Sequence, residues 1–452
     1  MVEGDANESL LLPEGSRLLH IGPPKTGTSA IQSAARAALP QLREHGVHYP
    51  NFGRGHGKAI ASFLDIQNLT LTGSEVEPGA TPDQALRAPS RAAWSALMAD
   101  VAREPSRRVL ISHEVTSQAS DVQAKELIQE LGYGVTHVVI TLRPLAELLA
   151  SRWSQNLKYG ESRTLEDWLS DLFDELQETP VRLAGPLDHA GLVERWANAA
   201  GPENVTVVLV SKEDRGLATA AFESLLRLPG GTLAEAGTDG PLVNRSMSAP
   251  EAEAIRRINE LSYDAETTSW PMYRHVMWRG GINRLLGSRS PDTTEPRVLL
   301  PAWAAERAVT AGTAHAAEIE GSGVRIVGDL KALSAKPGVP QAIPETSAES
   351  AADIAVQLMS GALDGASRYE SGLLRRIRRT QARADLEVAK RRKVQRRVRR
   401  LRRRTIRDQV EAMPAAQRPR SAARSYTTRD LVRALGMRVK HKVRTGKSMK
   451  LK

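Results

Sequence analysis

The chain of 452 residues contains no cysteine, and only 4% of its residues are aromatic. The absence of cysteine excludes disulfide bonds, thiolate metal ligands and cysteine nucleophiles, and it fits a reducing compartment. No run of about 18 apolar residues occurs that could cross a bilayer as a helix. The N-terminal segment has acidic residues where a signal peptide needs basic ones, and its apolar run, Leu10 to Leu12, is short. We therefore expect a cytoplasmic protein.

Charge is distributed unevenly along the chain. Residues 1–365 hold 33 Lys and Arg against 46 Asp and Glu, whereas residues 366–452 hold 30 against six. The first part therefore has a net charge of −13 and the second +24. An acidic globular part and a basic tail are expected to have different partners.

Apolar segments alternate with helical patterns over most of the acidic part. Strands are predicted at residues 17–22, 107–112, 136–142 and 205–210, and helices at 28–39, 121–131, 145–159, 188–199 and 251–261. Apolar strands separated by helices indicate an α/β fold with a parallel sheet covered on both faces. We expect a flexible N-terminus at 1–16, one domain at 17–330, a linker at 331–367 and a basic tail, helical or disordered, at 368–452.

The first predicted strand runs into a turn rich in Gly and Pro that opens a helix. This turn contains Pro24, Lys25, Thr26, Gly27, Thr28 and Ser29. Backbone N–H groups at such a helix start bind anions, Lys25 adds a positive charge and the hydroxyls add donors. Gly22 and Gly27 have the spacing of a nucleotide triphosphatase loop, but Thr28 occupies the position where that loop needs Lys. The segment is predicted to cradle a phosphate.

A second motif follows the strand at residues 136–142. Arg143 comes at the carboxyl end of this strand, which is the edge where open α/β sheets bind ligands. Pro144 suits the first position of a helix, and Ser151 lies two turns along it. A guanidinium and a hydroxyl placed in this way can hold one phosphate group.

Together these motifs resemble those of sulfotransferases that use 3′-phosphoadenosine-5′-phosphosulfate (PAPS), including bacterial sulfotransferase-like proteins. The family's loop reads P-K-x-G-T-[ST], and its site for the 3′-phosphate has an Arg with a Ser eight residues later. Trp153 stands where an aromatic, more usually Tyr, follows that Ser. Weaker resemblances lie at 112–114, 201–210 and 244–248, so the likeness covers about residues 17–262 and leaves the tail outside.

The resemblance implies a P-loop-like α/β domain that transfers a sulfuryl group from PAPS, as co-substrate and without a metal, to a hydroxyl or amine acceptor. Pro24 to Ser29, Arg143 and Ser151 would bind PAPS, and Lys25 would stabilise the leaving phosphate oxygen. His56 is the first candidate for the general base, with Glu114 second and Glu44 third. A carbohydrate or glycolipid acceptor is expected.

Two other functions remain open. The chain could be a non-catalytic scaffold that binds membrane or nucleic acid, or a P-loop kinase that uses ATP. The tail's residues 390–404 are too rich in like charge for a core, so they require solvent or an anionic partner. We expect an anionic polymer or the inner face of a membrane rather than sequence-specific nucleic acid, because no aromatic residue occurs from 370 to 425.

Overall fold

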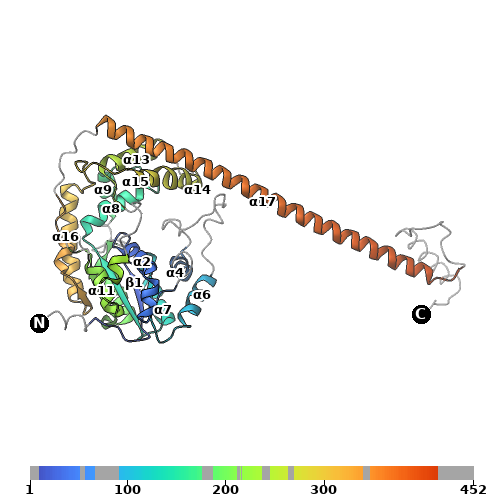
Figure 1. The fold of residues 1–452 in the computed structure, drawn as a ribbon, viewed down its shortest axis with the longest axis horizontal. Coiled ribbons are helices and arrows are strands. Elements are labelled where there is room, and N and C mark those ends of the chain that lie inside the picture. The colour runs from blue at the N-terminus through green and yellow to red at the C-terminus, as the bar shows by residue number, and fades with distance from the viewer. Residues whose placement is uncertain are drawn as a thin grey trace. The chain divides into compact units, whose positions relative to one another are not determined.

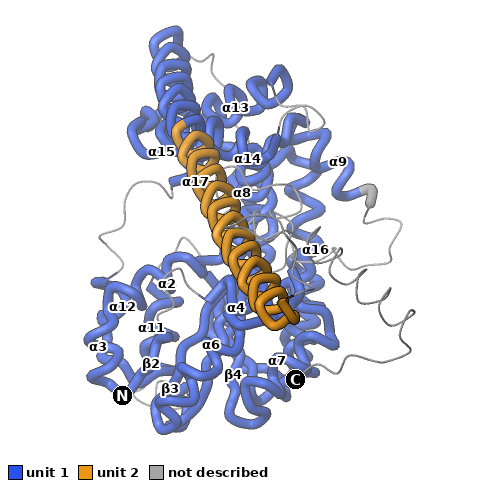
Figure 2. Tube along the Cα trace, turned by 90° about the vertical axis from the view of Figure 1, so that its right-hand side faces the viewer, with its two compact units in different colours: residues 1–370 blue, residues 371–452 orange. Residues whose placement is uncertain are grey.

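The computed structural model describes residues 10–50, 56–66, 91–175, 187–210, 214, 216–236, 245–262, 269–338 and 347–415. The chain divides into two compact units, residues 1–370 and 371–452 (Figure 2). Among the described residues, no helix combines the length and the hydropathy needed to cross a membrane.

The first unit is built on a sheet of six parallel strands (Figure 1). The strands are β1 (Arg17–Ile21), β2 (Val47–His48), β3 (Arg108–Ser112), β4 (Thr136–Leu142), β5 (Val205–Leu209) and β6 (Arg325–Val327). They are arranged in the order β2-β3-β1-β4-β5-β6. The predicted α/β class is confirmed, and the four predicted strands form the centre of this sheet.

Helices cover both faces of the sheet, because successive side chains of a strand point to opposite faces. In β1, Leu18 contributes to one core cluster, whereas Leu19 and Ile21 contribute to another. Helices on the Leu18 side are α2 (Thr28–Ala37), α3 (Leu39–Glu44), α11 (Leu217–Leu226) and α12 (Thr232–Ala236). Helices on the other side are α4 (Gly57–Phe63), α6 (Ala92–Val101), α7 (Asp121–Leu131) and α10 (His189–Ala200).

A third core cluster belongs to a layer of helices that follows β4. Its helices are α8 (Leu145–Leu157), α9 (Leu165–Glu175), α13 (Ala249–Ser262), α15 (Asn283–Ser288), α16 (Ala302–Glu320) and the first part of α17 (Ala348–Glu411). Short elements complete the unit: η2 (Glu114–Gln118), η4 (Pro202–Asn204), α14 (Trp270–Tyr273), the π-helix η7 (Arg274–Ile282) and η8 (Leu330–Ser334).

Residues 331–367 were expected to form a linker, but parts of this segment are helical. Residues 330–334 form η8, and α17 begins at Ala348. Ile354 and Leu358 of α17 are buried in the third core cluster. Gly361 lies so close to η7 that an added Cβ would come within 2.5 Å of the Gly280 carbonyl oxygen. The small residues that suggested a linker here allow two helices to approach closely.

Candidate functional site

The loop after β1 has a tightly curled backbone. Lys25 has a φ of 75° and Gly27 a φ of 93°, so both adopt the left-handed conformation that side chains other than glycine rarely take. Between them, Thr26 turns back and donates from its N–H over 3.3 Å and from its hydroxyl over 2.8 Å to the Pro23 carbonyl. This curl brings the chain directly into the first turn of α2, whose N–H groups have no partner within the helix.

A buried polar network holds the loop against the ends of three strands. His20 of β1 contacts the Ser112 hydroxyl of β3 at 2.9 Å and the Thr141 hydroxyl of β4 at 3.2 Å. Thr141 also lies 3.0 Å from the Thr26 hydroxyl. Burial lowers the pKa of His20 to about 3, which keeps the ring uncharged. The contact between His20 and Thr141 could not be predicted, since a strand pattern does not show which polar side chains face one another.

The second predicted motif meets the first directly. Arg143 donates from Nη1 to the Lys25 carbonyl oxygen at 3.0 Å and forms an ion pair with Glu147 of α8. The two motifs are 118 residues apart in sequence. The structure therefore brings together the lysine and the arginine that the sequence placed in one site.

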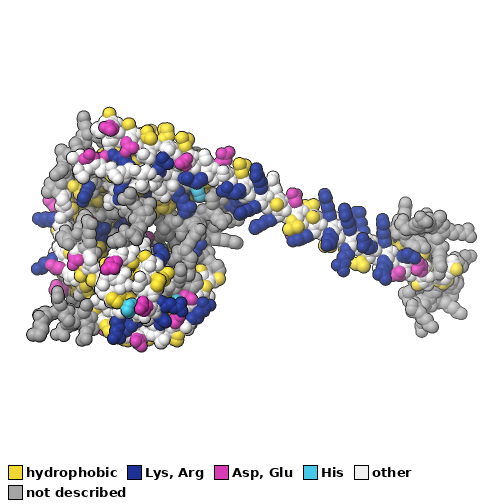
Figure 3. Space-filling view, in the orientation of Figure 1, with side chains coloured by type: hydrophobic (Ala, Val, Ile, Leu, Met, Phe, Trp, Pro, Cys, Tyr) yellow, Lys and Arg dark blue, Asp and Glu magenta, His cyan; other side chains and the backbone are white. Residues whose placement is uncertain are grey.

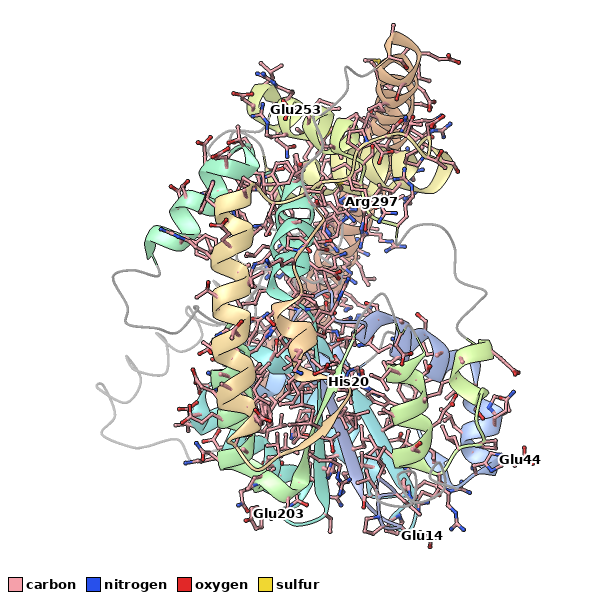
Figure 4. The ribbon with its side chains drawn as sticks, turned by 90° about the vertical axis from the view of Figure 1, so that its left-hand side faces the viewer. Glu14, His20, Glu44, Glu203, Glu253 and Arg297 are labelled. Carbon is pink, nitrogen blue, oxygen red and sulfur yellow. The ribbon has the colours of Figure 1, made fainter. Side chains whose placement is uncertain are left out.

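The site lies where the connections leaving the sheet diverge. After β1 the chain enters α2 on one face, whereas after β4 it continues through α8 to α10 on the other face. Parallel α/β sheets bind ligands beyond the carboxyl ends of strands at such a switch point. Figure 4 shows His20 near this edge, with Glu14 and Glu203 at the opposite edge, where β1 and β5 begin.

Two buried donors in the site have no partner among the described residues. One is the hydroxyl of Thr28, a residue only 1% exposed, and the other is Nε of Arg143. A buried polar group without a hydrogen bond costs about 1–3 kcal/mol, so proteins rarely leave such groups unused. Gly22 packs closely against β4, because an added Cβ would overlap the Thr141 hydroxyl. These features fit a bound anion that completes the donors' hydrogen bonds.

Charged side chains from three loops interact around Lys25. Burial lowers the pKa of Lys25, with Glu114 raising it and Arg143 lowering it further. Burial raises the pKa of Glu114, and the Lys25 charge partly opposes this change. Glu114 follows β3, Lys25 follows β1 and Arg143 follows β4, which are neighbouring strands. Glu114 is therefore the predicted base candidate that lies beside the phosphate loop.

The end of α8 contributes residues that sequence analysis did not select. Burial, together with the charges of Lys25 and Arg245, lowers the pKa of Lys158 to about 8. Glu114 helps to raise the pKa of the adjacent Tyr159, after burial as the main cause. Because these residues lie in the last turn of the helix predicted at 145–159, no local pattern indicates that their side chains face the loop.

Aromatic rings extend the site beyond Tyr159. The Tyr159 and Trp278 rings meet edge to face with centroids 5.0 Å apart, and Trp270 lies 6.1 Å from Tyr159. All three side chains are partly exposed. Trp278 belongs to the π-helix η7, an irregularity that occurs often at functional sites. The two tryptophan rings therefore pack around Tyr159, whose hydroxyl interacts electrostatically with Glu114.

His56 does not have the geometry of the expected general base. Its side chain is fully buried, Nε2 lies 2.8 Å from the Pro50 carbonyl oxygen, and Nδ1 accepts from the Ser112 N–H at 3.0 Å. Nε2 must therefore carry the proton, and neither nitrogen is left to accept one from a substrate. Burial lowers the pKa of His56 to about 4. The structure corrects the expectation, since His56 connects two backbone segments.

Glu44 is also outside the site. It is exposed at the last position of α3, just before β2 begins, and parallel strands begin at the edge opposite the phosphate loop. Figure 4 shows Glu44 pointing outward, away from His20. The expectation that Glu44 acts as a base is therefore not supported.

The remaining predicted residues lie in the loop after β1 and on the helices α2 and α8. Pro24 is partly buried within the loop, and Ser29 is exposed in the first turn of α2. Ser151 is partly exposed on α8, two turns after Arg143. Among the described residues, no three His, Asp or Glu side chains converge in a way that could hold a metal ion.

Comparisons of the chain with protein-family models, with curated proteins and with solved structures find no significant match. The class that the fold defines is therefore an α/β protein with a six-stranded parallel sheet and a polar site at its switch point.

Proposed function

We propose that this chain is a sulfotransferase that moves a sulfuryl group from PAPS to a hydroxyl acceptor. The observation that carries the proposal is the convergence of Lys25 and Arg143, with the buried donors of Thr28 and Arg143 left without partners among the described residues. PAPS has two phosphate groups, and the loop after β1 and Arg143 after β4 each offer donors to a phosphate. The sequence motifs that resemble those of sulfotransferases supply the same residues.

In the proposed reaction, Glu114 accepts the proton of the acceptor hydroxyl. The acceptor oxygen forms a bond to sulfur while the bond from sulfur to the 5′-phosphate oxygen breaks. Lys25 and the N–H groups of the loop stabilise the negative charge that develops on this leaving oxygen. Arg143 and Ser151 hold the 3′-phosphate, so the products are 3′-phosphoadenosine-5′-phosphate (PAP) and a sulfated acceptor.

The acceptor is proposed to be a carbohydrate or a glycolipid. Tyr159, Trp270 and Trp278 offer partly exposed ring surface, of which Tyr159 lies near Glu114, and sugar rings stack on such surfaces through their apolar faces. Lys158 adds a positive charge nearby, which favours acceptors that carry an acidic group.

Acceptor-dependent release of PAP from PAPS would test this proposal. The protein is incubated with PAPS and neutral or acidic oligosaccharides, and PAP is separated and quantified. Wild type is expected to release PAP faster with at least one saccharide, whereas Glu114→Gln and Lys25→Ala lose that increase. Glu126→Gln, an exposed carboxylate on α7, serves as the matched control. Saccharide-dependent PAP release that is equal in all four proteins, or absent in wild type, would overturn the proposal.

A further inference from the structure

The second unit contains a helix whose two sides differ in chemistry. We call residues 371–411 of α17 the basic helix, since they hold 17 Lys and Arg against four Asp and Glu. Figure 3 shows the Lys and Arg side chains along it in dark blue. A net charge of +13 on one helix strongly disfavours burial in a protein core.

Apolar residues of the basic helix recur at helical spacing. Val394, Val398 and Leu401 are separated by four and three residues, so they lie along one side, which we call the apolar face. These side chains are 60%, 43% and 54% exposed. Thr405 continues this spacing, and a shallow hollow beside it is lined by Val398, Leu401, Arg402, Thr405, Ile406 and Gln409. Water therefore contacts the apolar side chains of Val394, Val398 and Leu401 over about two turns.

Arginines occupy the opposite side with the same spacing. Arg396, Arg400, Arg403 and Arg407 recur at intervals of four, three and four residues, each displaced by two from a residue of the apolar face. Arg397 and Arg404 lie on one flank of the apolar face, and Arg399 and Arg402 lie on the other. A helix with an apolar face and basic flanks can insert the face between acyl chains while its flanks contact headgroups.

From this arrangement we infer that the basic helix binds the surface of an anionic lipid membrane and lies parallel to it. Anionic lipid satisfies both observations, since headgroups neutralise the arginines and acyl chains cover the apolar face. An anionic polymer would satisfy the charge alone and leave the apolar face in water. A second copy of the helix would cover the apolar face but bring another charge of +13 beside the first.

The test uses the full chain and two kinds of vesicle, one of phosphatidylcholine alone and one of equal parts phosphatidylcholine and phosphatidylglycerol. Sedimentation with the vesicles measures the partition coefficient. Wild type is expected to bind the anionic vesicles and not the neutral ones. Val398→Gln/Leu401→Gln removes apolar surface without changing the charge, and it should lower the partition coefficient at least about tenfold. Arg397→Gln/Arg404→Gln should also lower the partition coefficient about tenfold, because each arginine near the anionic headgroups strengthens binding electrostatically.

A soluble polyanion distinguishes the other occupants. Heparin binding should weaken in Arg397→Gln/Arg404→Gln and stay unchanged in Val398→Gln/Leu401→Gln, and circular dichroism checks that both variants keep their helix content. The inference is overturned if wild type does not bind the anionic vesicles, or if Val398→Gln/Leu401→Gln binds them as well as wild type. It is also overturned if the chain self-associates through the apolar face, shown by a larger sedimentation coefficient that this variant abolishes.

Discussion

Arg143 donates a hydrogen bond from Nη1 to the backbone carbonyl of Lys25 at 3.0 Å, across 118 residues of sequence. Lys25 has a left-handed backbone conformation that costs a non-glycine residue about 1 kcal/mol, and this bond helps to hold it. One arginine therefore stabilises the loop conformation and also holds a buried Nε donor that has no partner among the described residues.

Two substitutions of Arg143 separate these roles. Arg143→Gln keeps an N–H donor near Lys25 but removes the charge, whereas Arg143→Ala removes both. We expect both variants to lose PAP affinity by about 10- to 100-fold, as hydrogen bonds to charged groups contribute about 1.5–3 kcal/mol. Only Arg143→Ala should also lower the melting temperature. Calorimetry and thermal unfolding measure the two effects, and unchanged PAP affinity in Arg143→Ala would remove it from the site.

The Thr28 hydroxyl can be removed with little change of shape. Thr28→Val deletes a buried donor that has no partner among the described residues. The free protein is expected to keep its stability or gain about 1 kcal/mol, while PAP affinity falls about tenfold. Urea unfolding and calorimetry provide the two values. A loss of stability without a change in affinity would show that the hydroxyl serves the fold.

Glu114 should control the pH dependence of turnover. A general base works when deprotonated, and burial raises the pKa of Glu114 above its ordinary value of 4.5. The rate is therefore expected to fall as pH decreases through this raised pKa. Glu114→Gln should lower kcat about 100-fold and lose this acidic limb, while PAP affinity changes little. A pH profile of PAP release that is the same in the variant and in wild type would contradict the role.

His189 should make the fold sensitive to acid. Both of its ring nitrogens are buried without a hydrogen-bond partner in the described part of the chain, and burial, followed by the charge of His315, lowers its pKa from 6.5 to about 3. The unfolded chain therefore binds a proton that the folded protein excludes, so this contribution to stability is complete above pH 6.5 and is lost progressively as pH falls toward 3.

His189→Leu removes both the unsatisfied ring and its titration. The free energy of unfolding of the variant is expected to exceed that of wild type by about 1 kcal/mol at about pH 7. Between about pH 7 and pH 5 the variant should lose less of this free energy than wild type does. Urea unfolding at both pH values measures the difference, with His45→Gln as an exposed control. A variant that is less stable than wild type at both values would show that the imidazole has a favourable structural role.

The central strands could be predicted from the sequence because each contains consecutive apolar residues. The two edge strands were missed for a physical reason, since β2 has only two residues and the three residues of β6 are half-buried. Such short segments carry too little hydrophobic pattern to indicate a strand. The linker prediction was wrong at Gly361 because it relied on composition. Glycines occur both in loose segments and where helices approach closely, as Gly361 does.

For the site, the sequence identified the groups that follow strands but not the contacts among them. Lys25 and Arg143 were placed together correctly, since the carboxyl ends of parallel strands share one edge. His56 was misjudged because residue type does not reveal that both ring nitrogens are already used. Lys158 was missed because it reaches the site through the packing of α8, which no local pattern encodes.

Binding of PAP to the wild-type protein, measured by calorimetry beside AMP and ATP, tests the central claim most directly. The account predicts micromolar affinity for PAP, at least about tenfold weaker binding of AMP, which lacks the 3′-phosphate, and a loss of PAP binding in Lys25→Ala. Lys331→Ala, at an exposed lysine of η8, should bind PAP like wild type. Absence of PAP binding, or ATP binding as tight as PAP binding, would contradict the sulfotransferase assignment and favour a scaffold or a kinase.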